Sequence, residues 1–233
     1  MIQFMKSSRL SDTTLRLQKN VSPIISNSSS ESTLSYNRKE MPRYCIVVDL
    51  DYTLVNVDTT AMCVEYACPL KYKFLHYILF LFVLKFFIPL LNRIVKRDVY
   101  KLLLTRTCLK NCEMLDEIAE KVYFDSLKVF NIHIFKAALS TNAMKILLTA
   151  SIDSIAKKFY DLGFDMVISS NIKCRNGELH ELIDLYGKKH IILQQLLKYC
   201  DKILVIEDNP EPQYRTLKDI KVIEARSYGR KGS

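Results

Sequence analysis

The most constraining feature of the sequence is a short apolar run that ends in two aspartates. Residues Cys45 to Val48 are typical of a buried strand, and Asp49, Asp51 and Thr53 follow them. Two carboxylates at the end of a buried strand are costly unless a cation lies between them. Mg²⁺ suits such a site, because it prefers hard oxygen ligands and keeps water and phosphate oxygens in its shell. The pattern therefore predicts magnesium-dependent phosphoryl transfer, in which one carboxylate attacks phosphorus and the other transfers protons.

Three later segments carry polar residues at positions where they can join the two aspartates. The apolar run 145–151 ends in Thr-Ala-Ser, and the run 202–209 ends in Glu207 and Asp208. Between these runs, Lys189 precedes a predicted helix. Strands alternate with helices in this part of the chain, so the fold class is predicted to be α/β, with a parallel and doubly wound sheet. Ligands bind at the carboxyl ends of such strands, where these polar residues lie.

In their order along the chain, these segments resemble the four motifs of the haloacid dehalogenase (HAD) superfamily. Motif I has the form DxDx[TV], which Asp49 to Thr53 match. Thr149 at the end of a strand, a lysine before a helix and Asp208 after a buried strand match the other three. The resemblance covers roughly residues 44–225 and implies a Rossmann-like sheet with the strand order 5-4-1-2-3.

The resemblance also implies a reaction that runs through a covalent intermediate. Asp49 would attack phosphorus to form an aspartyl-phosphate, and Asp51 would protonate the leaving alcohol and then activate water. Mg²⁺ would be held by the Asp49 carboxylate, the Asp51 backbone carbonyl and Asp208. Thr149 and Lys189 would balance the charge of the transferring phosphoryl group.

Some assignments around this site stay open in the sequence. Lys188 and His190 also fit the lysine motif, and Lys189 is preferred because a permanent cation is needed beside two carboxylates. Ala150 and Ser151 are predicted to bind substrate, and Ser151 can also cap the helix that follows.

Three positions depart from the family pattern. Tyr52 replaces the more common glycine of motif I, and Glu207 replaces the first residue of motif IV. Pro212 stands where a trailing acid is common, and Glu211 precedes it. These departures leave Asp208 in place as a ligand. The irregular motif IV, together with the apolar segment Phe74 to Leu91, motivates a second hypothesis, a catalytically weak HAD scaffold that binds a membrane or a protein partner.

Residues 57–140 are predicted to form a helical insert between the first two core strands. The insert resembles the C1 cap of phosphoserine-phosphatase-like HAD enzymes, in which a cap closes over the site and selects the substrate. The core would comprise residues 41–56 and 141–226, after a disordered tail at 1–40 that holds few large apolar residues. Asp58 can contact substrate from the start of the cap or act as the N-cap of the next helix, and the N-cap role is preferred.

The insert contains a segment, Phe74 to Leu91, that is apolar on every helical face. Lys85 and Pro89 make its insertion across a bilayer marginal, and one span would separate the first motif from the last. Peripheral membrane contact through 74–95 is compatible with an enzyme, as are a buried cap core and a dimer interface. The main hypothesis is a Mg²⁺-dependent phosphomonoester phosphatase for a small-molecule, amphiphilic or lipid-linked phosphate.

Composition narrows the expected setting and partners. The net charge of +9 suits an anionic substrate or an acidic membrane surface, whereas no basic run with interleaved aromatics indicates nucleic acid. The seven cysteines form no CxxC pair, so reduced core thiols are expected, and a zinc site at Cys108 and Cys112 is disfavoured. Residues 1–40 lack the apolar region of a secretory signal, so we expect a cytoplasmic protein, with peripheral membrane contact as an alternative.

Overall fold

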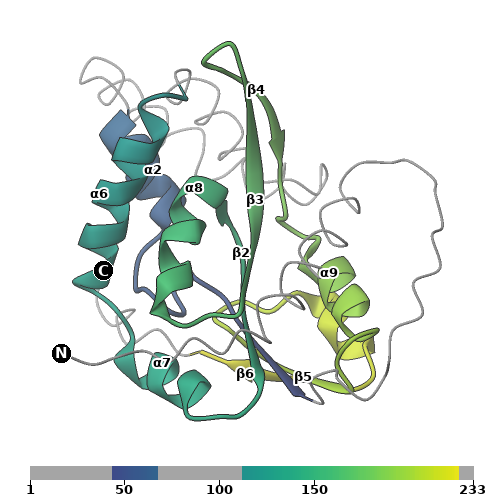
Figure 1. Cartoon of the computed structure of the whole chain (residues 1–233). Helices are drawn as coiled ribbons and strands as arrows, with labels where there is room; N and C mark the ends of the chain where they lie inside the picture. Colours follow the sequence, from purple (N-terminus) through teal and green to yellow (C-terminus); the bar gives the residue numbers. More distant parts are fainter. Residues whose placement is uncertain (1–43, 68–111, 226–233) are drawn as a thin grey trace, which may run out of the picture.

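The computed structural model describes residues 44–67 and 112–225 and shows one six-stranded sheet (Figure 1). The strands are β1 (Tyr44–Val48), β2 (Met144–Ile152), β3 (Met166–Arg175), β4 (Glu178–Ile183), β5 (Lys202–Glu207) and β6 (Ile220–Glu224). Their order across the sheet is β4-β3-β2-β1-β5-β6. Every neighbouring pair is parallel except β3 and β4, which form an antiparallel hairpin. Apart from the hairpin strand β4, this is the predicted order, which is therefore confirmed.

Helices cover both faces of the sheet, as expected for a doubly wound fold. The described helices are α2 (Thr59–Ala67), α6 (Leu115–Leu127), α7 (Ile132–Leu139), α8 (Asp153–Ala156) and α9 (Lys189–Leu196), with 3₁₀ turns η4 (Lys157–Leu162) and η5 (Pro212–Thr216). In Figure 1, α2, α6, α7 and α8 lie on one side of the sheet and α9 lies on the other. The α/β fold class predicted from the sequence is confirmed.

An apolar cluster lies on each face of the sheet, and β1 contributes to both. Ile46 and Val48 join the cluster beneath α6 and α8, whereas Cys45 and Val47 join the cluster beneath α9. Alternate side chains of a strand point to opposite faces, so a strand covered on both faces is a continuous apolar run. This packing explains why the run before Asp49 has no polar residue, and it holds the carboxyl end of β1 rigidly.

The described parts of the predicted cap pack on the sheet. Cys63 of α2 and Leu115, Ile118 and Val122 of α6 belong to the same apolar cluster as β1. Residues 68–111, with the apolar segment 74–95, lie outside the described residues, as do the predicted tail 1–40 and the end of the chain after 225. The boundaries of the cap therefore stay predictions. None of the helices within 44–67 and 112–225 is long and apolar enough to span a bilayer.

The segment after Ser151 differs from the predicted helix. β2 continues to Ile152, and a short α8 and the 3₁₀ turn η4 follow in place of one helix. The N-cap of α8 is Ile152, without a side-chain cap, so the predicted capping role of Ser151 is wrong. The reason is that the Ser151 hydroxyl is occupied by two threonines of α2, at 2.6 Å from Thr59 Oγ1 and 3.2 Å from Thr60 Oγ1.

The expectation of reduced thiols is also wrong for four cysteines. Cys45 is bonded to Cys200, and Cys112 is bonded to Cys174, with Cα–Cα distances of 6.0 and 6.3 Å. Because Cys112 is bonded to Cys174, it is not a zinc ligand. Cys63 keeps a free, buried thiol, and burial raises its pKa to about 12. The pairings follow from tertiary proximity, which the spacing of cysteines along the chain does not reveal.

Candidate active site

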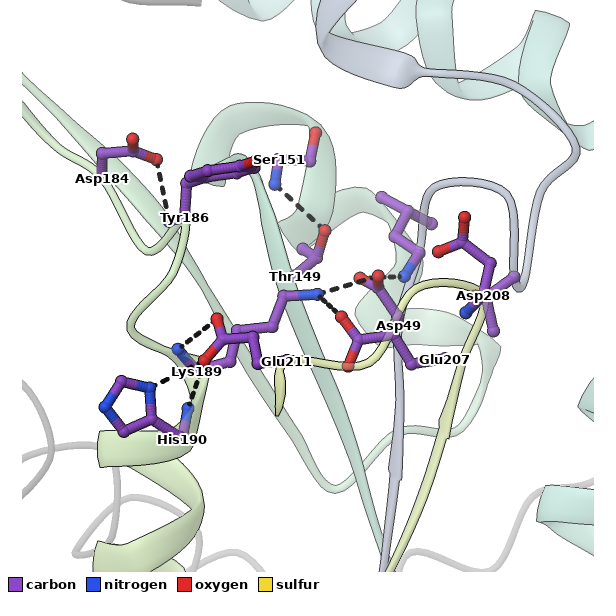
Figure 2. A network of polar contacts seen from close by, with 12 residues as sticks. Asp49, Thr149, Ser151, Asp184, Tyr186, Lys189, His190, Glu207, Asp208 and Glu211 are labelled. Atoms are coloured by element: carbon purple, nitrogen blue, oxygen red, sulfur yellow. Dashed lines mark hydrogen bonds and ion pairs between the residues drawn. The ribbon is translucent and has the colours of Figure 1, made fainter. Parts of the chain in front are cut away.

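The candidate site lies where the carboxyl ends of β1, β2 and β5 meet (Figure 2). The backbone N–H of Asp49 donates to Ile206 O at 3.0 Å, which fixes the end of β1 against β5. The N–H of Asp208 donates to Thr53 Oγ1 at 2.9 Å, which ties the loop after β5 to the loop after β1. The first and last of the predicted motifs are therefore adjacent, as the sheet order requires.

Lys189 joins two carboxylates at the centre of the site. Its Nζ lies 2.8 Å from Asp49 Oδ2 and 2.6 Å from Glu207 Oε1, and Figure 2 shows the side chain reaching between them. Lys189 is 6 % exposed. Burial alone would lower the pKa of this lysine, but the charges of Asp49 and Glu207 outweigh burial, so the pKa is raised. The lysine therefore stays charged and compensates both acids.

The other two candidates for the lysine motif face elsewhere. Lys188 Nζ donates to the backbone oxygen of Asp184 at 3.1 Å, and His190 Nδ1 lies 2.7 Å from Glu211 Oε2. Only Lys189, of the three residues, contacts Asp49 in the structure. The geometry thus selects the residue that the need for a permanent cation had favoured.

Glu207 is an ion-pair partner that the sequence analysis left without a role. Its side chain is buried, and burial and Asp49 raise its pKa to about 7, although Lys189 acts in the opposite direction. Tyr214 is also buried, and its hydroxyl lies close to the Glu207 carboxylate. Burial and the charges of Glu207 and Glu211 raise the pKa of this tyrosine. The position of Glu207 next to Asp208 was a signal for its role, whereas nothing in the sequence pointed to Tyr214.

Asp51 is held by the first residue of α2. Its Oδ1 accepts hydrogen bonds from the Thr59 backbone N–H at 2.9 Å and from Thr59 Oγ1 at 2.8 Å. Burial, Asp58 and Asp49 raise the pKa of Asp51 to about 8. At neutral pH this carboxyl group can therefore hold a proton, which a general acid must do. Thr59 was missed from the sequence, although the polar run after motif I contained it.

Asp58 takes the N-cap position that the sequence analysis preferred. Its Oδ1 accepts a hydrogen bond from the backbone N–H of Ala61 at 2.8 Å, at the start of α2. A carboxylate at this position satisfies an N–H group that has no partner within the helix. Contact of Asp58 with a substrate stays a prediction.

A bulge in β2 shapes the second predicted motif. The register of β2 against β3 shifts between Leu148 and Ile152, so that Thr149, Ala150 and Ser151 lie opposite a single residue, Ser169. Bulges redirect side chains and are common beside active sites. Thr149 is buried, and its Oγ1 accepts a hydrogen bond from the Ser151 N–H at 3.0 Å. The Ala150 carbonyl accepts from Ser170 Oγ at 2.7 Å.

Glu211 binds the first backbone N–H groups of α9. Its carboxylate accepts hydrogen bonds from the backbone N–H groups of Lys189 and His190, each at 3.1 Å, as well as contacting the His190 ring. A negative charge at the N-terminus of a helix is stabilised by the helix dipole. Glu211 thus fixes the helix that delivers Lys189.

Tyr52 adopts a backbone conformation that favours glycine. Its φ is 55°, in the left-handed region, and its backbone N–H donates to Val57 O at 3.3 Å. This conformation gives a physical reason for the glycine that is more common at this position, because a side chain here is strained.

The carboxylate oxygens of the site are chemically suitable ligands for a hard divalent cation, but they do not form a cluster in the structure. Within residues 44–67 and 112–225, no three His, Cys, Asp or Glu side chains form a cluster that could hold a metal ion. Burial, and after it the charge of neighbouring carboxylates, raises the pKa values of Asp51 and Glu207, so several acidic groups lie close together here. Carboxylate oxygens are the ligands that Mg²⁺ prefers.

Comparisons with known proteins give structural matches. No protein-family model matches the sequence, and no curated protein matches it. Similar solved structures include a protein of unknown function from Bordetella pertussis Tohama I, with a TM-score of 0.53, 14% identity and coverage of 77% of this chain and 89% of that one. A phosphoserine phosphohydrolase-like protein from Francisella tularensis subsp. tularensis SCHU S4 gives a TM-score of 0.51 at 14% identity, with coverage of 74% and 82%.

A phosphoserine phosphatase from T. onnurineus is also similar, with a TM-score of 0.48, 12% identity and coverage of 82% of this chain and 94% of that one. At such low identities, structural similarity indicates a shared fold, and the function has to be argued from the residues of the site. The chain therefore shares the α/β fold of the Bordetella pertussis protein and of the phosphoserine phosphohydrolase-like protein from Francisella tularensis.

Proposed function

We propose that the chain is a magnesium-dependent phosphomonoester phosphatase that works through an aspartyl-phosphate on Asp49. The observation that carries this proposal is the buried 2.8 Å contact between Asp49 Oδ2 and Lys189 Nζ at the end of β1. The other oxygen of Asp49 accepts the Leu50 N–H at 2.8 Å, so the carboxylate is held in one orientation. An oriented, charge-compensated carboxylate is suited to attack phosphorus.

The neighbouring residues supply the remaining steps. As Asp49 forms a bond to phosphorus, the bond to the leaving oxygen breaks, and Asp51 gives that oxygen a proton. Asp51 then takes a proton from the water that hydrolyses the aspartyl-phosphate. Lys189 and Thr149 offset the charge of the transferring phosphoryl group, the lysine by its ammonium and the threonine by its hydroxyl.

Mg²⁺ would be held by the Asp49 carboxylate, the Asp51 backbone carbonyl and the Asp208 carboxylate. It would supply positive charge where three acids and a phosphate dianion meet. The closeness of Asp49 to Asp51 and Glu207, which contributes to the raised pKa of each, supports this part of the proposal.

The substrate is proposed to be an amphiphilic or lipid-linked phosphate. This part rests on the sequence of residues 74–95, whose apolar character favours peripheral contact with a membrane or a lipid substrate. Asp58, Ala150 and Ser151 stay candidate substrate-binding residues. A screen of phosphomonoesters that includes detergent-solubilised lipid phosphates separates a lipid preference from a preference for small polar esters.

The decisive test of the nucleophile is the Asp49→Asn variant. The variant should lose at least about 10³-fold of the Mg²⁺-dependent hydrolysis of p-nitrophenyl phosphate, because an amide cannot form the aspartyl-phosphate. Asp219→Asn is the matched control. Asp219 is exposed and has a φ of 67°, which asparagine adopts readily, so this variant should hydrolyse at the wild-type rate. Retention of hydrolysis in Asp49→Asn would show that the nucleophile lies elsewhere.

One observation favours a second candidate function, a catalytically weak HAD scaffold that binds a membrane or protein partner. Glu211, which follows motif IV, is engaged by α9, and the described carboxylates do not form a finished metal cluster. A scaffold of this kind would turn over no ester in the screen. Hydrolysis that EDTA abolishes and Mg²⁺ restores would exclude it.

A further inference from the structure

We propose that a chain of three buried hydroxyl groups positions the Asp51 carboxylate, holding one oxygen and leaving the other to meet the leaving group. The three groups belong to Thr59 and Thr60, at the start of α2, and to Ser151, in the bulge of β2. The proposal rests on the proposed function, because Asp51 is there the group that gives and takes the proton.

The contacts form one continuous path. Thr60 Oγ1 lies 3.2 Å from Ser151 Oγ, Ser151 Oγ lies 2.6 Å from Thr59 Oγ1, and Thr59 Oγ1 donates to Asp51 Oδ1 at 2.8 Å. The hydroxyl-bearing residues are buried, with exposures of 8 % for Thr60, 1 % for Ser151 and 0 % for Thr59. Because these hydroxyls contact one another and end on the Asp51 carboxylate, we treat them as positioning residues that act through Asp51.

The direction of the path follows from counting protons. A hydroxyl group carries one proton to donate and accepts at two lone pairs. Thr59 gives its only proton to Asp51, so Ser151 must be the donor to Thr59. Ser151 has then used its own proton, so Thr60 must be the donor to Ser151. All three dipoles therefore point toward the carboxylate, and each hydrogen bond strengthens the next.

This arrangement distinguishes the two oxygens of Asp51. Oδ1 accepts from both the backbone N–H and the hydroxyl of Thr59. Oδ2 has no hydrogen-bond partner among the described residues. Two donors on Oδ1 leave Oδ2 as the oxygen that carries the transferable proton. When the aspartyl-phosphate forms, that proton moves from Oδ2 to the leaving oxygen as the bond between phosphorus and oxygen breaks.

Ser151 joins this path to the phosphate side of the site. Its backbone N–H donates to Thr149 Oγ1 at 3.0 Å and occupies one lone pair there, so the hydroxyl proton of Thr149 is directed away from Ser151. One residue thus orients both the proton donor, through its side chain, and the threonine of motif II, through its backbone. The bulge in β2 makes this double contact possible, since it places Thr149 and Ser151 side by side opposite one residue of β3.

The test compares Thr59→Val, which removes the hydroxyl at nearly constant volume, with Thr59→Ser, which keeps it. Two substrates are used: p-nitrophenyl phosphate, whose leaving group needs little protonation, and glycerol 2-phosphate, whose alkoxide needs a proton. The value of kcat/KM reports the steps up to release of the leaving group. Thr141→Val is the control, because Thr141 precedes β2 at the opposite end of the strand, where its hydroxyl donates to Ala138 O at 2.9 Å.

In Thr59→Val, kcat/KM for glycerol 2-phosphate should fall about 10- to 100-fold, because part of the rate increase that a general acid provides is lost. The fall should lie in kcat, with KM nearly unchanged. For p-nitrophenyl phosphate, kcat/KM of the same variant should fall by less than about threefold. Thr59→Ser and Thr141→Val should stay within about twofold for both substrates. Equal losses on the two substrates, or a Thr59→Ser variant as impaired as Thr59→Val, would overturn the positioning role while leaving the proposed phosphatase intact.

If the wild-type protein hydrolyses no ester in the screen, the proposed function is rejected. The positioning of Asp51 can then still be tested by crystallography. In a crystal structure of Thr59→Val, the Asp51 carboxylate should turn from the orientation that it has in the wild type. An unchanged orientation in the variant would overturn the proposal independently of any activity.

Discussion

Lys189 is the residue on which the electrostatics of the site depend. Its ammonium group lies between Asp49 and Glu207, and all three side chains are buried. One positive charge therefore compensates two negative charges. Because the site is buried, leaving either carboxylate unpaired would cost more free energy than it would at the surface. An uncompensated buried carboxylate destabilises the fold. In the proposed mechanism Lys189 also holds the nucleophile, so both stability and activity should depend on this lysine.

Replacing Lys189 by methionine should lower the free energy of unfolding by about 3–5 kcal/mol at pH 8, because two buried carboxylates lose their cation. The loss should shrink at pH 5, where protons can neutralise the same acids. Urea unfolding at both pH values measures the change. Lys188→Met is the matched control: Lys188 is half-buried and donates only to the Asp184 carbonyl, so its loss should be about 1 kcal/mol or less. Similar losses in the two variants would show that the ion pairs add no special stability.

The identity of most site residues could be inferred from the sequence, but their contacts could not. The need for a permanent cation favours a lysine over His190, but only the geometry distinguishes Lys189 from Lys188. Thr59 gave no comparable signal, because a threonine after an N-cap residue is ordinary. Its contact with Asp51 depends on the loop that folds back between them. Ser151 was assigned to a helix cap because the length of β2 was underestimated.

Among the elements, the hairpin of β3 and β4 shows what local sequence specifies well. Asn-Gly pairs favour a tight hairpin turn, and Asn176 and Gly177 both adopt positive φ, 54° and 78°, as a type I′ turn requires. The disulfides show the opposite case. Cys112 precedes α6 and Cys174 lies on β3, 62 residues later, so only the packed fold brings them together. The bond fastens the returning end of the insert to the hairpin, where Cys112 N–H also donates to Gly177 O at 2.9 Å.

Removal of this link in the double variant Cys112→Ala/Cys174→Ala should lower the free energy of unfolding by about 2–4 kcal/mol, chiefly because the unfolded chain regains freedom. Urea unfolding under non-reducing conditions measures the loss. Cys63→Ala serves as the control, because Cys63 is buried with a free thiol, and it should lose about 1 kcal/mol or less. A double variant as stable as the wild type would mean that the two cysteines are reduced in the folded protein.

Over the whole molecule, negative charge gathers at one end of the sheet although the chain as a whole carries +9. Asp51 and Glu207 have pKa values raised from 3.8 and 4.5 to about 8 and about 7. A raised carboxyl pKa means that the folded state binds protons more tightly than the unfolded state. Stability is therefore highest at low pH within this window and falls as the pH rises through the folded pKa values. In the proposed enzyme, the net positive charge of the chain would help attract an anionic substrate.

The metal-free protein should accordingly have a Tm that falls between about pH 5 and pH 8. Mg²⁺ binds the ionised carboxylates, so it should raise Tm more at pH 8 than at pH 5, by an amount that grows with its concentration. Thermal unfolding with and without the ion measures both effects without any substrate. Asp208→Asn should retain the fall of Tm with pH but lose most of the Mg²⁺ effect, because Asp208 is a proposed ligand and contributes neither of the two raised pKa values. A Tm that is indifferent to Mg²⁺ at pH 8 would argue for the scaffold rather than the enzyme.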